Sequence, residues 1–260
     1  MTGRRPIALV TGGCRRVGAA IAGRLGEGGY DLALHGGHRL DPDPELIARL
    51  DRAGAAYRLL RADLSIAAQV DGLIDDAAAA FGRPVRLLVN NASRFDANEA
   101  GLPDMAALID YFAVNAAAPF RLAVRLAAQA DDDADAAGGR AVVNLLDQRI
   151  DHPNHDQIAY TLSKQALAAA TRTLAVALAP GVRVNGVAPG LTLPTADYDA
   201  VQMERLAAMM PLRRLPNPAD IAEAVHYLAT APAVTGQTLF VDGGAAMTGF
   251  DRDFVNLARD

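Results

Sequence analysis

The sequence predicts an α/β protein built on a doubly wound parallel sheet of seven strands, with helices on both faces. Short apolar runs alternate with longer alanine-rich stretches along the 260 residues, which is the rhythm of repeated βαβ units. Several short runs, such as Ala141-Val142-Val143, are apolar at consecutive positions, as strands buried on both faces are. The length lies near the upper limit for one hydrophobic core, so residues 1–260 are expected to form a single domain.

The expected strands and helices alternate from one end of the chain to the other. Strands are expected at Ile7–Val10, Asp31–His35, Ala56–Arg61, Leu87–Asn90, Arg140–Leu146, Val182–Ala188 and Thr238–Val241. Helices are expected at Val17–Glu27, Pro44–Arg52, Ile66–Phe81, Met105–Ala130, Ile158–Leu178 and Pro218–Ala229. Alanine favours these helices because it has the highest helix propensity. In such a sheet, ligands bind at the carboxyl ends of the strands.

Composition excludes several classes of protein. The chain has 25 Lys+Arg and 30 Asp+Glu, a net charge of −5, and no basic run, which excludes a nucleic-acid or anionic-membrane surface. One cysteine, Cys14, permits neither an internal disulfide nor a thiolate metal cluster. The sequence contains no signal peptide and no uninterrupted apolar run of roughly 18 residues, so we expect a cytoplasmic protein that does not span a membrane. Four histidines are expected at the surface or in loops without ligand spacing, so no metal site is predicted: His35, His152, His155 and His226.

A glycine-rich turn follows the first expected strand. The strand runs into Thr11-Gly12-Gly13-Cys14-Arg15-Arg16-Val17-Gly18, and a helix begins there. Gly12 and Gly18 would let the backbone approach a pyrophosphate, and the helix N-terminus offers N–H groups and a positive dipole. The strand–turn–helix context therefore predicts dinucleotide binding, although a tight turn without a ligand has the same local pattern.

The segment after the second expected strand bears on the choice of dinucleotide. An NAD site has an acidic residue there, which accepts hydrogen bonds from the ribose 2′-hydroxyl. Here the strand ends in Leu34-His35-Gly36-Gly37-His38-Arg39, and the next acid is Asp41. Arg39, assisted by His38, suits a 2′-phosphate because guanidinium donates charge-assisted hydrogen bonds to phosphate. The pattern favours NADP(H) over NAD(H).

A tyrosine and a lysine four residues apart open the fifth expected helix. The spacing of Tyr160 and Lys164 puts both side chains on one helical face. A tyrosine has a pKa of about 10, and a neighbouring cation lowers it toward working pH. The pair can therefore exchange protons, although the same spacing also occurs in ordinary surface pairs.

Together these features resemble the short-chain dehydrogenase/reductase family over nearly the whole chain. The matching positions are Gly12, Gly18, Asp63-Leu64, Asn90-Asn91-Ala92, Asn115, Tyr160, Lys164, Asn185 and Pro189-Gly190. The resemblance implies a Rossmann-type fold, a nicotinamide cofactor, Tyr160 as proton donor, and Lys164 on the nicotinamide ribose. It also implies that Asn115 holds a water in the proton relay. Further cofactor contacts are implied for Gly12, Arg16, Gly18, His38, Arg39, Asp63, Leu64, Asn90, Ala92, Pro189 and Gly190.

One departure from the family concerns the residue that polarises the substrate. Members usually carry a serine about a dozen residues before the tyrosine, but no Ser or Thr lies between Arg140 and Tyr160. The expected strand instead leads into Asp147. An ionised aspartate is a poor oxyanion donor, so it suits a substrate that offers N–H groups or a nitrogen that needs a proton.

Three features narrow the resemblance to the pteridine reductases and the bacterial dihydromonapterin and dihydrofolate reductases of the short-chain type. They are Asp147, Arg16 within the glycine turn, and Ser93 with Phe95 after the double asparagine. The resemblance implies a pterin ring between Phe95 and the nicotinamide, with Ser93, Asp147 and Tyr160 at its edge. Arg16 would contact the cofactor phosphates and the pterin. Hydride would pass from NADPH to a C=N bond, with Asp147 or Tyr160 relaying the proton.

Two other functions remain open from the sequence. An ordinary short-chain ketone or alcohol oxidoreductase, of the 3-oxoacyl-ACP reductase or sugar dehydrogenase type, could carry Asp147 as an individual feature. A non-catalytic NADP-binding sensor would not need Asn115, Tyr160 and Lys164. The family resemblance also implies a homotetramer packed through the helix of Tyr160 and the last strand. The tail Phe250–Asp260 is expected to dock on a neighbouring subunit.

Overall fold

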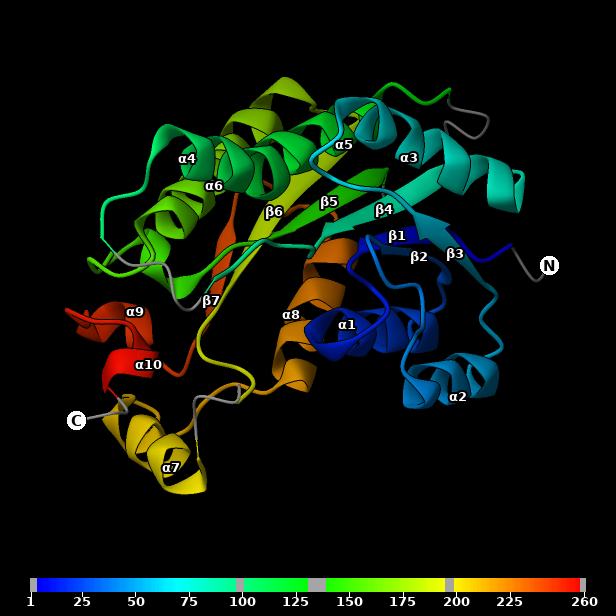
Figure 1. Cartoon of the computed structure of the whole chain (residues 1–260). Helices are drawn as coiled ribbons and strands as arrows, with labels where there is room; N and C mark the ends of the chain where they lie inside the picture. Colours follow the sequence, from blue (N-terminus) through cyan, green and yellow to red (C-terminus); the bar gives the residue numbers. More distant parts are fainter. Residues whose placement is uncertain (1–3, 97–100, 131–138, 195–198, 258–260) are drawn as a thin grey trace.

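The computed structural model describes residues 4–96, 101–130, 139–194 and 199–257. Within them, seven strands form one sheet in the order β3-β2-β1-β4-β5-β6-β7, and every neighbouring pair is parallel (Figure 1). The predicted fold class is confirmed. The strands are β1 (Ile7–Thr11), β2 (Asp31–Gly36), β3 (Tyr57–Arg61), β4 (Val85–Asn90), β5 (Arg140–Leu145), β6 (Val182–Pro189) and β7 (Thr238–Val241).

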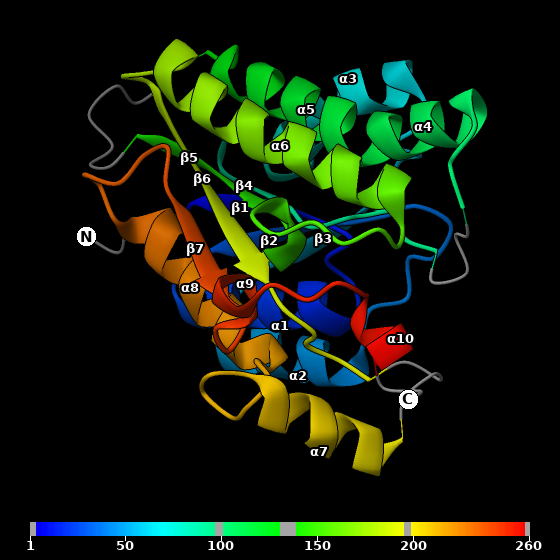
Figure 2. The same cartoon turned by 90° about the vertical axis from the view of Figure 1, so that its left-hand side faces the viewer.

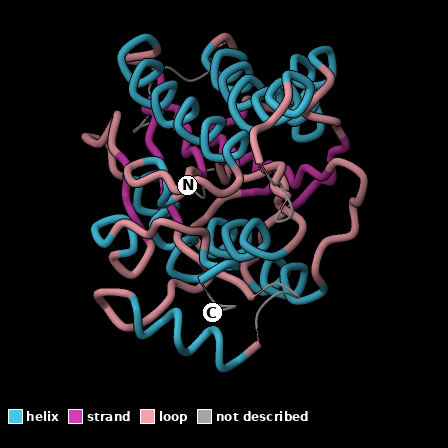
Figure 3. Tube along the Cα trace, turned by 60° about the vertical axis from the view of Figure 1, so that its left-hand side comes forward, coloured by secondary structure: helices cyan, strands magenta, loops and turns pink. Residues whose placement is uncertain are grey.

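Helices cover both faces of the sheet, which makes three layers (Figure 3). One face carries α1 (Arg16–Glu27), α2 (Pro44–Arg52) and α8 (Pro218–Thr230), and the other carries α3 (Ala67–Phe81), α5 (Ala118–Ala127) and α6 (Ile158–Ala177). Successive side chains of β1 point alternately toward the two helical layers, because side chains alternate between the faces of a strand. Ala8 and Val10 pack into the core beneath α1 and α8, while Ile7 and Leu9 pack into the core beneath α3 and α5.

The helix expected over Met105–Ala130 is one helical run of three segments. α4 (Met105–Phe112) leads into the π-helical turn η1 (Ala113–Ala117), and α5 follows. Asn115 lies in that turn, and such turns often occur at functional sites. By length and composition alone the run from Met105 to Ala127 could cross a membrane. In the fold it lies in the helical layer with α3 and α6, as a helix of a globular domain does.

A small subdomain of three helices lies beyond the carboxyl ends of β6 and β7 (Figure 2). It consists of α7 (Ala200–Met209), α9 (Ala245–Thr248) and α10 (Phe254–Leu257), which lie outside the six helices expected to cover the sheet. Phe254 packs with Leu206 and Met210 in a hydrophobic cluster that is separate from the two cores beneath the sheet. The described part of the C-terminal tail, residues 250–257, therefore packs on its own subunit, and its contact with a neighbouring subunit stays a prediction.

The order of the strands determines where in the sheet a ligand can bind. The chain turns from β1 outward to β3 and then returns to the other side of β1 with β4. The carboxyl ends of β1 and β4 consequently diverge into helices on opposite faces, and a crevice opens between them. Both the glycine turn after β1 and Asn91-Ala92 after β4 lie at this point.

Candidate active site

The glycine turn is held in shape by close backbone packing. Gly12 has a φ of +62°, which a glycine adopts without strain. A Cβ on Gly18 would lie 2.0 Å from the carbonyl oxygen of Gly12, so α1 approaches the turn only because residue 18 has no side chain. The Nδ2 of Asn91 donates to the carbonyls of Thr11 and Gly12 at 2.9 and 3.1 Å. The turn is therefore preformed for a ligand at the N-terminus of α1.

His35 supports this turn from inside the sheet, and its expected place at the surface is wrong. It is 2% exposed; its Nδ1 accepts from the backbone N–H of Gly12 at 3.3 Å, and its Nε2 lies 2.9 Å from the carbonyl of Ala62. Burial lowers the pKa of His35, so the ring is neutral and can accept at Nδ1 while donating at Nε2. The sequence offered one signal, since a histidine inside an apolar strand needs hydrogen-bond partners.

The residues predicted for the 2′-phosphate and the adenine lie at the ends of β2 and β3. His38 and Arg39 are exposed, and Asp63 is partly buried. Hydrogen bonds from Ser65 lower the pKa of Asp63, and the charge of His38 contributes to that shift. Leu64 is buried beneath this corner. The structure brings these four predicted residues together outside the main cleft.

The main cleft, with a volume of about 550 Å³, runs from the glycine turn to the start of α6. Most of the predicted site residues line it: Gly12, Arg16, Gly18, Ala92, Ser93, Phe95, Asp147, Tyr160, Lys164, Pro189 and Gly190. The side chains of Asn90 and Asn115 lie behind its wall. Asn90 donates to Asn144 Oδ1 at 2.8 Å inside the sheet, and it is Asn91, rather than Asn90, that lines the cleft.

Asn115 connects the loop after β4 to helix α6. Its Oδ1 accepts from the backbone of Arg94 at 2.7 Å and from Ser93 Oγ at 3.2 Å. Its Nδ2 donates to the Arg94 carbonyl and to Ser163 Oγ, both at 3.0 Å. Four hydrogen bonds use the full capacity of a side-chain amide. The amide of Asn115 therefore positions the loop that carries Ser93 and Phe95. That Asn115 holds a water in a proton relay stays a prediction.

Tyr160 and Asp147 are joined by a hydrogen bond inside the cleft. The Tyr160 hydroxyl donates to Oδ2 of Asp147 at 2.9 Å, and the Lys164 ammonium donates to the Leu145 carbonyl at 2.8 Å, with its Nζ 5.7 Å from the Tyr160 ring centroid. Burial, with the negative charge of Asp147, raises the pKa of Tyr160. Burial lowers the pKa of Lys164 to about 8, although Asp147 opposes that shift. The phenol of Tyr160 is therefore protonated at neutral pH. It lies close to Lys164, whose pKa is about 8.

Phe95 and Arg16 border the open side of the cleft. Phe95 is 43% exposed, and its ring meets the Tyr160 ring edge-on with centroids 4.9 Å apart. An aromatic face left this open beside a proton donor is a platform on which a flat heterocycle can stack. Arg16 is exposed, and its backbone N–H donates to Asp43 at 3.3 Å. Its neighbour Arg15 is instead paired with Asp41.

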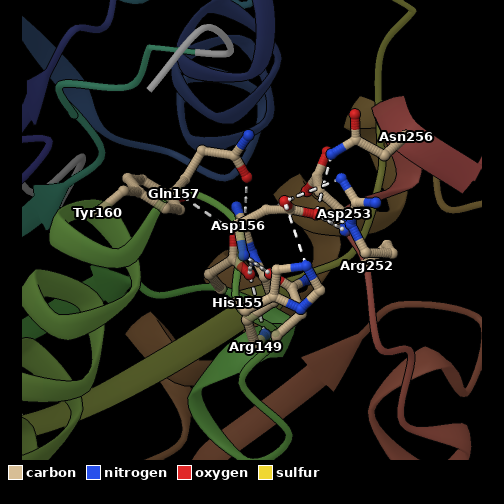
Figure 4. Close-up of polar contacts among 10 residues, drawn as sticks. Arg149, His155, Asp156, Gln157, Tyr160, Arg252, Asp253 and Asn256 are labelled. Atoms are coloured by element: carbon tan, nitrogen blue, oxygen red, sulfur yellow. Dashed lines mark hydrogen bonds and ion pairs between the residues drawn. The ribbon is translucent and has the colours of Figure 1, made fainter. Parts of the chain in front are cut away.

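One residue of the cleft wall escaped sequence reasoning. Arg149 belongs to the short 3₁₀ turn η2 (Gln148–Ile150), and its side chain is 5% exposed. It contacts Asp147, and it also contacts Gln157 and Asp253, which Figure 4 shows beside it. The only local signal is its place two residues after Asp147.

Residues 4–96, 101–130, 139–194 and 199–257 contain no group of His, Cys, Asp and Glu side chains that could hold a metal ion.

Comparison with known proteins extends these observations. The family model described as Enoyl-(Acyl carrier protein) reductase matches residues 13–246. Pteridine reductase 1 of Leishmania tarentolae is 33% identical over 94% of this chain and 97% of its own. The structure of FolM alternative dihydrofolate reductase 1 from Brucella canis, complexed with NADP, superposes with a TM-score of 0.84 at 38% identity, over 94% of this chain and 95% of that one.

A ketone reductase is also similar. The structure of the promiscuous reductase LugOII, which catalyses keto-reduction at C1 during lugdunomycin biosynthesis, has a TM-score of 0.81 at 31% identity, over 93% of this chain and 99% of that one. The family match, the parallel seven-stranded sheet and the Tyr160–Lys164 pair agree. The chain belongs to the short-chain dehydrogenase/reductase family.

Proposed function

We propose that the protein is an NADPH-dependent reductase that adds hydride and a proton across a C=N bond of a dihydropterin, giving the tetrahydropterin. The observation that carries this proposal is the hydrogen bond between Tyr160 and Asp147 at the end of the cleft. A ketone reductase needs a donor at that place to stabilise the developing oxyanion, and a carboxylate is an acceptor. A pterin edge carries N–H groups, which a carboxylate can accept.

The glycine turn fits the pyrophosphate of NADP(H). Because Gly12 and Gly18 have no side chains, an anion can approach the backbone of the turn and the N-terminus of α1 closely. We assign the 2′-phosphate to His38 and Arg39, because the end of β2 carries these two residues and no acid. When bound, NADPH supplies the hydride. The remaining cofactor contacts are assigned to Arg16, Asp63, Leu64, Ala92, Lys164, Pro189 and Gly190.

The substrate pocket follows from three side chains beside the cofactor site. Phe95 would stack against one face of the pterin, and Ser93 and Asp147 would hydrogen-bond its edge. Arg16 would reach both the pterin and the cofactor phosphates. A flat ring rich in hydrogen-bonding groups needs a stacking platform and polar partners at its rim, and these residues provide both.

Proton delivery falls to Tyr160. Its raised pKa keeps the phenol protonated at neutral pH, so it can give its proton to the ring nitrogen as hydride reaches the carbon. The Lys164 ammonium, whose Nζ lies 5.7 Å from the ring centroid, then favours the phenolate that remains. Asp147 accepts from the substrate and holds the phenol in place between turnovers.

The relatives support both the proposal and its main alternative. Pterin and dihydrofolate reductases align over nearly the whole chain, but so does LugOII, a ketone reductase. Kinetic assays on the purified protein, with NADPH and either dihydrobiopterin, dihydrofolate or an acetoacetyl ester, separate the two. Turnover of the pterin at a kcat/KM well above that of the ester is expected. Reduction of the ester alone would identify a ketone reductase, and cofactor binding without turnover would identify a sensor.

We also propose that the protein is a homotetramer located in the cytoplasm. Large apolar side chains are exposed on α6 and β7, the two elements through which we expect a homotetramer to pack: Leu162, Val176 and Phe240. Light scattering after gel filtration tests the tetramer, and a monomer would contradict it. A cytoplasmic location stays our expectation from the single cysteine.

A further inference from the structure

Arg149 is a buried cation held by groups from three separate parts of the chain. Its backbone N–H donates to Oδ1 of Asp147 at 2.9 Å, and its Nε lies 3.3 Å from the same oxygen. Its Nη1 donates to Oε1 of Gln157 at 2.9 Å and lies 3.2 Å from Oδ2 of Asp253. Asp147 follows β5. Gln157 precedes α6, and Asp253 comes from the C-terminal part of the chain (Figure 4).

The guanidinium of Arg149 also faces the substrate side of the cleft. Its central carbon lies 5.0 Å from the centroid of the Tyr160 ring and 5.8 Å from that of Phe95. These distances allow a cation–π interaction with both rings. Arg149 thus contacts the proton donor, its carboxylate partner and the stacking platform at once, although its own side chain is buried.

A second aspartate fastens the C-terminal segment, defined here as residues 250–257. The carboxylate of Asp156 accepts from Nε of Arg252 at 2.9 Å, from the backbone N–H of Asp253 at 2.8 Å and from Nδ2 of Asn256 at 2.9 Å. Burial would raise the pKa of Asp156, but these hydrogen bonds outweigh it and lower the pKa to about 2. Asp156 is therefore ionised at neutral pH and holds the segment as an acceptor.

We propose that the C-terminal segment is a positioning element of the active site: Asp156 latches it, Asp253 pairs with Arg149, and Arg149 holds Asp147 against Tyr160. The inference rests on the proposed roles of Asp147 and Tyr160. Asp147 uses one oxygen for Arg149 and the other for Tyr160. A buried guanidinium without its second carboxylate would compete for both oxygens of Asp147, because a buried charge must find partners.

The first test compares two identical substitutions two residues apart. Asp253→Asn removes the charge that faces Arg149, while Asp251→Asn removes the charge of an exposed neighbour in the same segment. We expect Asp253→Asn to lower kcat about 10- to 100-fold with a smaller effect on KM, because misplacement of reacting groups reduces the chemical step. Asp251→Asn should retain wild-type kcat, and both variants should bind NADPH as the wild type does.

The second test asks whether the latch acts through Asp253. Asp156→Ala should lower kcat to a similar extent, and hydrogen exchange measured by mass spectrometry should become faster in residues 250–257. The double variant Asp156→Ala/Asp253→Asn should be no slower than the worse single variant, because both act through one chain of contacts. Additive losses in the double variant would show that Asp156 and Asp253 act separately, which would overturn the latch.

The third test separates positioning from folding through the pH profile. The charges facing Tyr160 are those of Asp147, Arg149, Asp253 and Lys164, and Arg149 lowers the pKa of both Tyr160 and Lys164. Arg149→Met should therefore lower kcat and move the alkaline limb of kcat/KM to higher pH. Arg149→Lys keeps the charge and should restore the limb and part of kcat. A substitution that only reduces the amount of folded protein would lower the activity at every pH, and the alkaline limb of kcat/KM would stay at the same pH.

The outcomes distinguish this inference from the proposed function. If the wild type reduces a dihydropterin and Asp253→Asn matches its kcat and pH profile, the positioning role is overturned while the pterin function stands. If the wild type reduces only ketones, the pterin function fails. The variants are then compared on the ketone, for which Tyr160 is still the proton donor, and an unchanged kcat there would overturn the positioning role as well.

Discussion

The hydroxyl of Tyr160 donates a 2.9 Å hydrogen bond to Oδ2 of Asp147, across the gap between the start of α6 and the end of β5. The bond joins the proton donor of the family to a carboxylate at a position where most members have a hydroxyl. A substrate that enters here meets an acceptor and a donor side by side. Nitrogen heterocycles offer both a proton donor and a proton acceptor at one edge, and simple ketones offer only an acceptor.

Asp147→Ala should lower kcat on a dihydropterin about 100-fold, the usual contribution of a general acid–base partner. The affinity for NADPH should stay close to that of the wild type, because Asp147 lies on the substrate side of the cleft. Steady-state kinetics with a fluorescence titration of NADPH measure both quantities. Pterin turnover at the wild-type rate would show that Asp147 is a bystander.

The rate should fall above about pH 8, where Lys164 loses its proton. Burial lowers the pKa of Lys164, and the charge of Asp147 partly restores it. Asp147→Asn should therefore move the alkaline limb of kcat/KM to lower pH, because the ammonium loses its favourable partner. Profiles of both proteins between about pH 6 and pH 10 provide the comparison. A limb that stays in place would mean that another group controls it.

Phe95→Ala should raise the KM for a dihydropterin about 10- to 100-fold, from the loss of stacking and of apolar contact area. The melting temperature should change little, since the ring is 43% exposed. Phe120→Ala is the matched control, because Phe120 is 41% exposed on α5, away from the cleft, and its loss should leave KM unchanged. A large drop in stability with a normal KM would assign Phe95 to the core instead.

NADPH should be preferred over NADH by at least about tenfold in kcat/KM, the value of one charge-assisted contact with the 2′-phosphate. Arg39→Ala should reduce that preference, whereas Arg52→Ala, at an exposed position of α2, should not. Equal use of both cofactors by the wild type would contradict the assignment. A preference that survives Arg39→Ala would move the contact to His38 or Arg16.

His35 should make the fold sensitive to mild acid. Burial holds the pKa of His35 below its usual value, so the unfolded chain takes up this proton at a higher pH than the folded one. Stability from this group is complete above about pH 6.5 and is lost as the pH falls toward the pKa of the folded state. His35→Gln should flatten the slope of melting temperature against pH in that range. An equal slope in both proteins would exclude His35 as its cause.

The sequence by itself determined the fold class, the alternation of strands and helices, and several of the residues that line the cleft. These features are local, because a run of apolar residues, a glycine turn or a four-residue spacing has its meaning within one or two elements. Because these signals are local, they did not predict the exact ends of the strands. β1 continues to Thr11, and β4 begins at Val85, where pairing with neighbouring strands rather than composition decides. The π-helical turn at Asn115 and the short helices α9 and α10 were missed for the same reason.

Only the tertiary structure decided which polar side chains support the site. His35, Arg149 and Asp253 look like ordinary loop or strand residues in the sequence, yet each is buried against a functional group. Burial and partnership depend on elements far apart along the chain, and a charged residue becomes a positioning group only when packing removes it from water. The reactive residues could therefore be predicted from local pattern, whereas the groups that hold them required the packing of β5, α6 and the C-terminal segment.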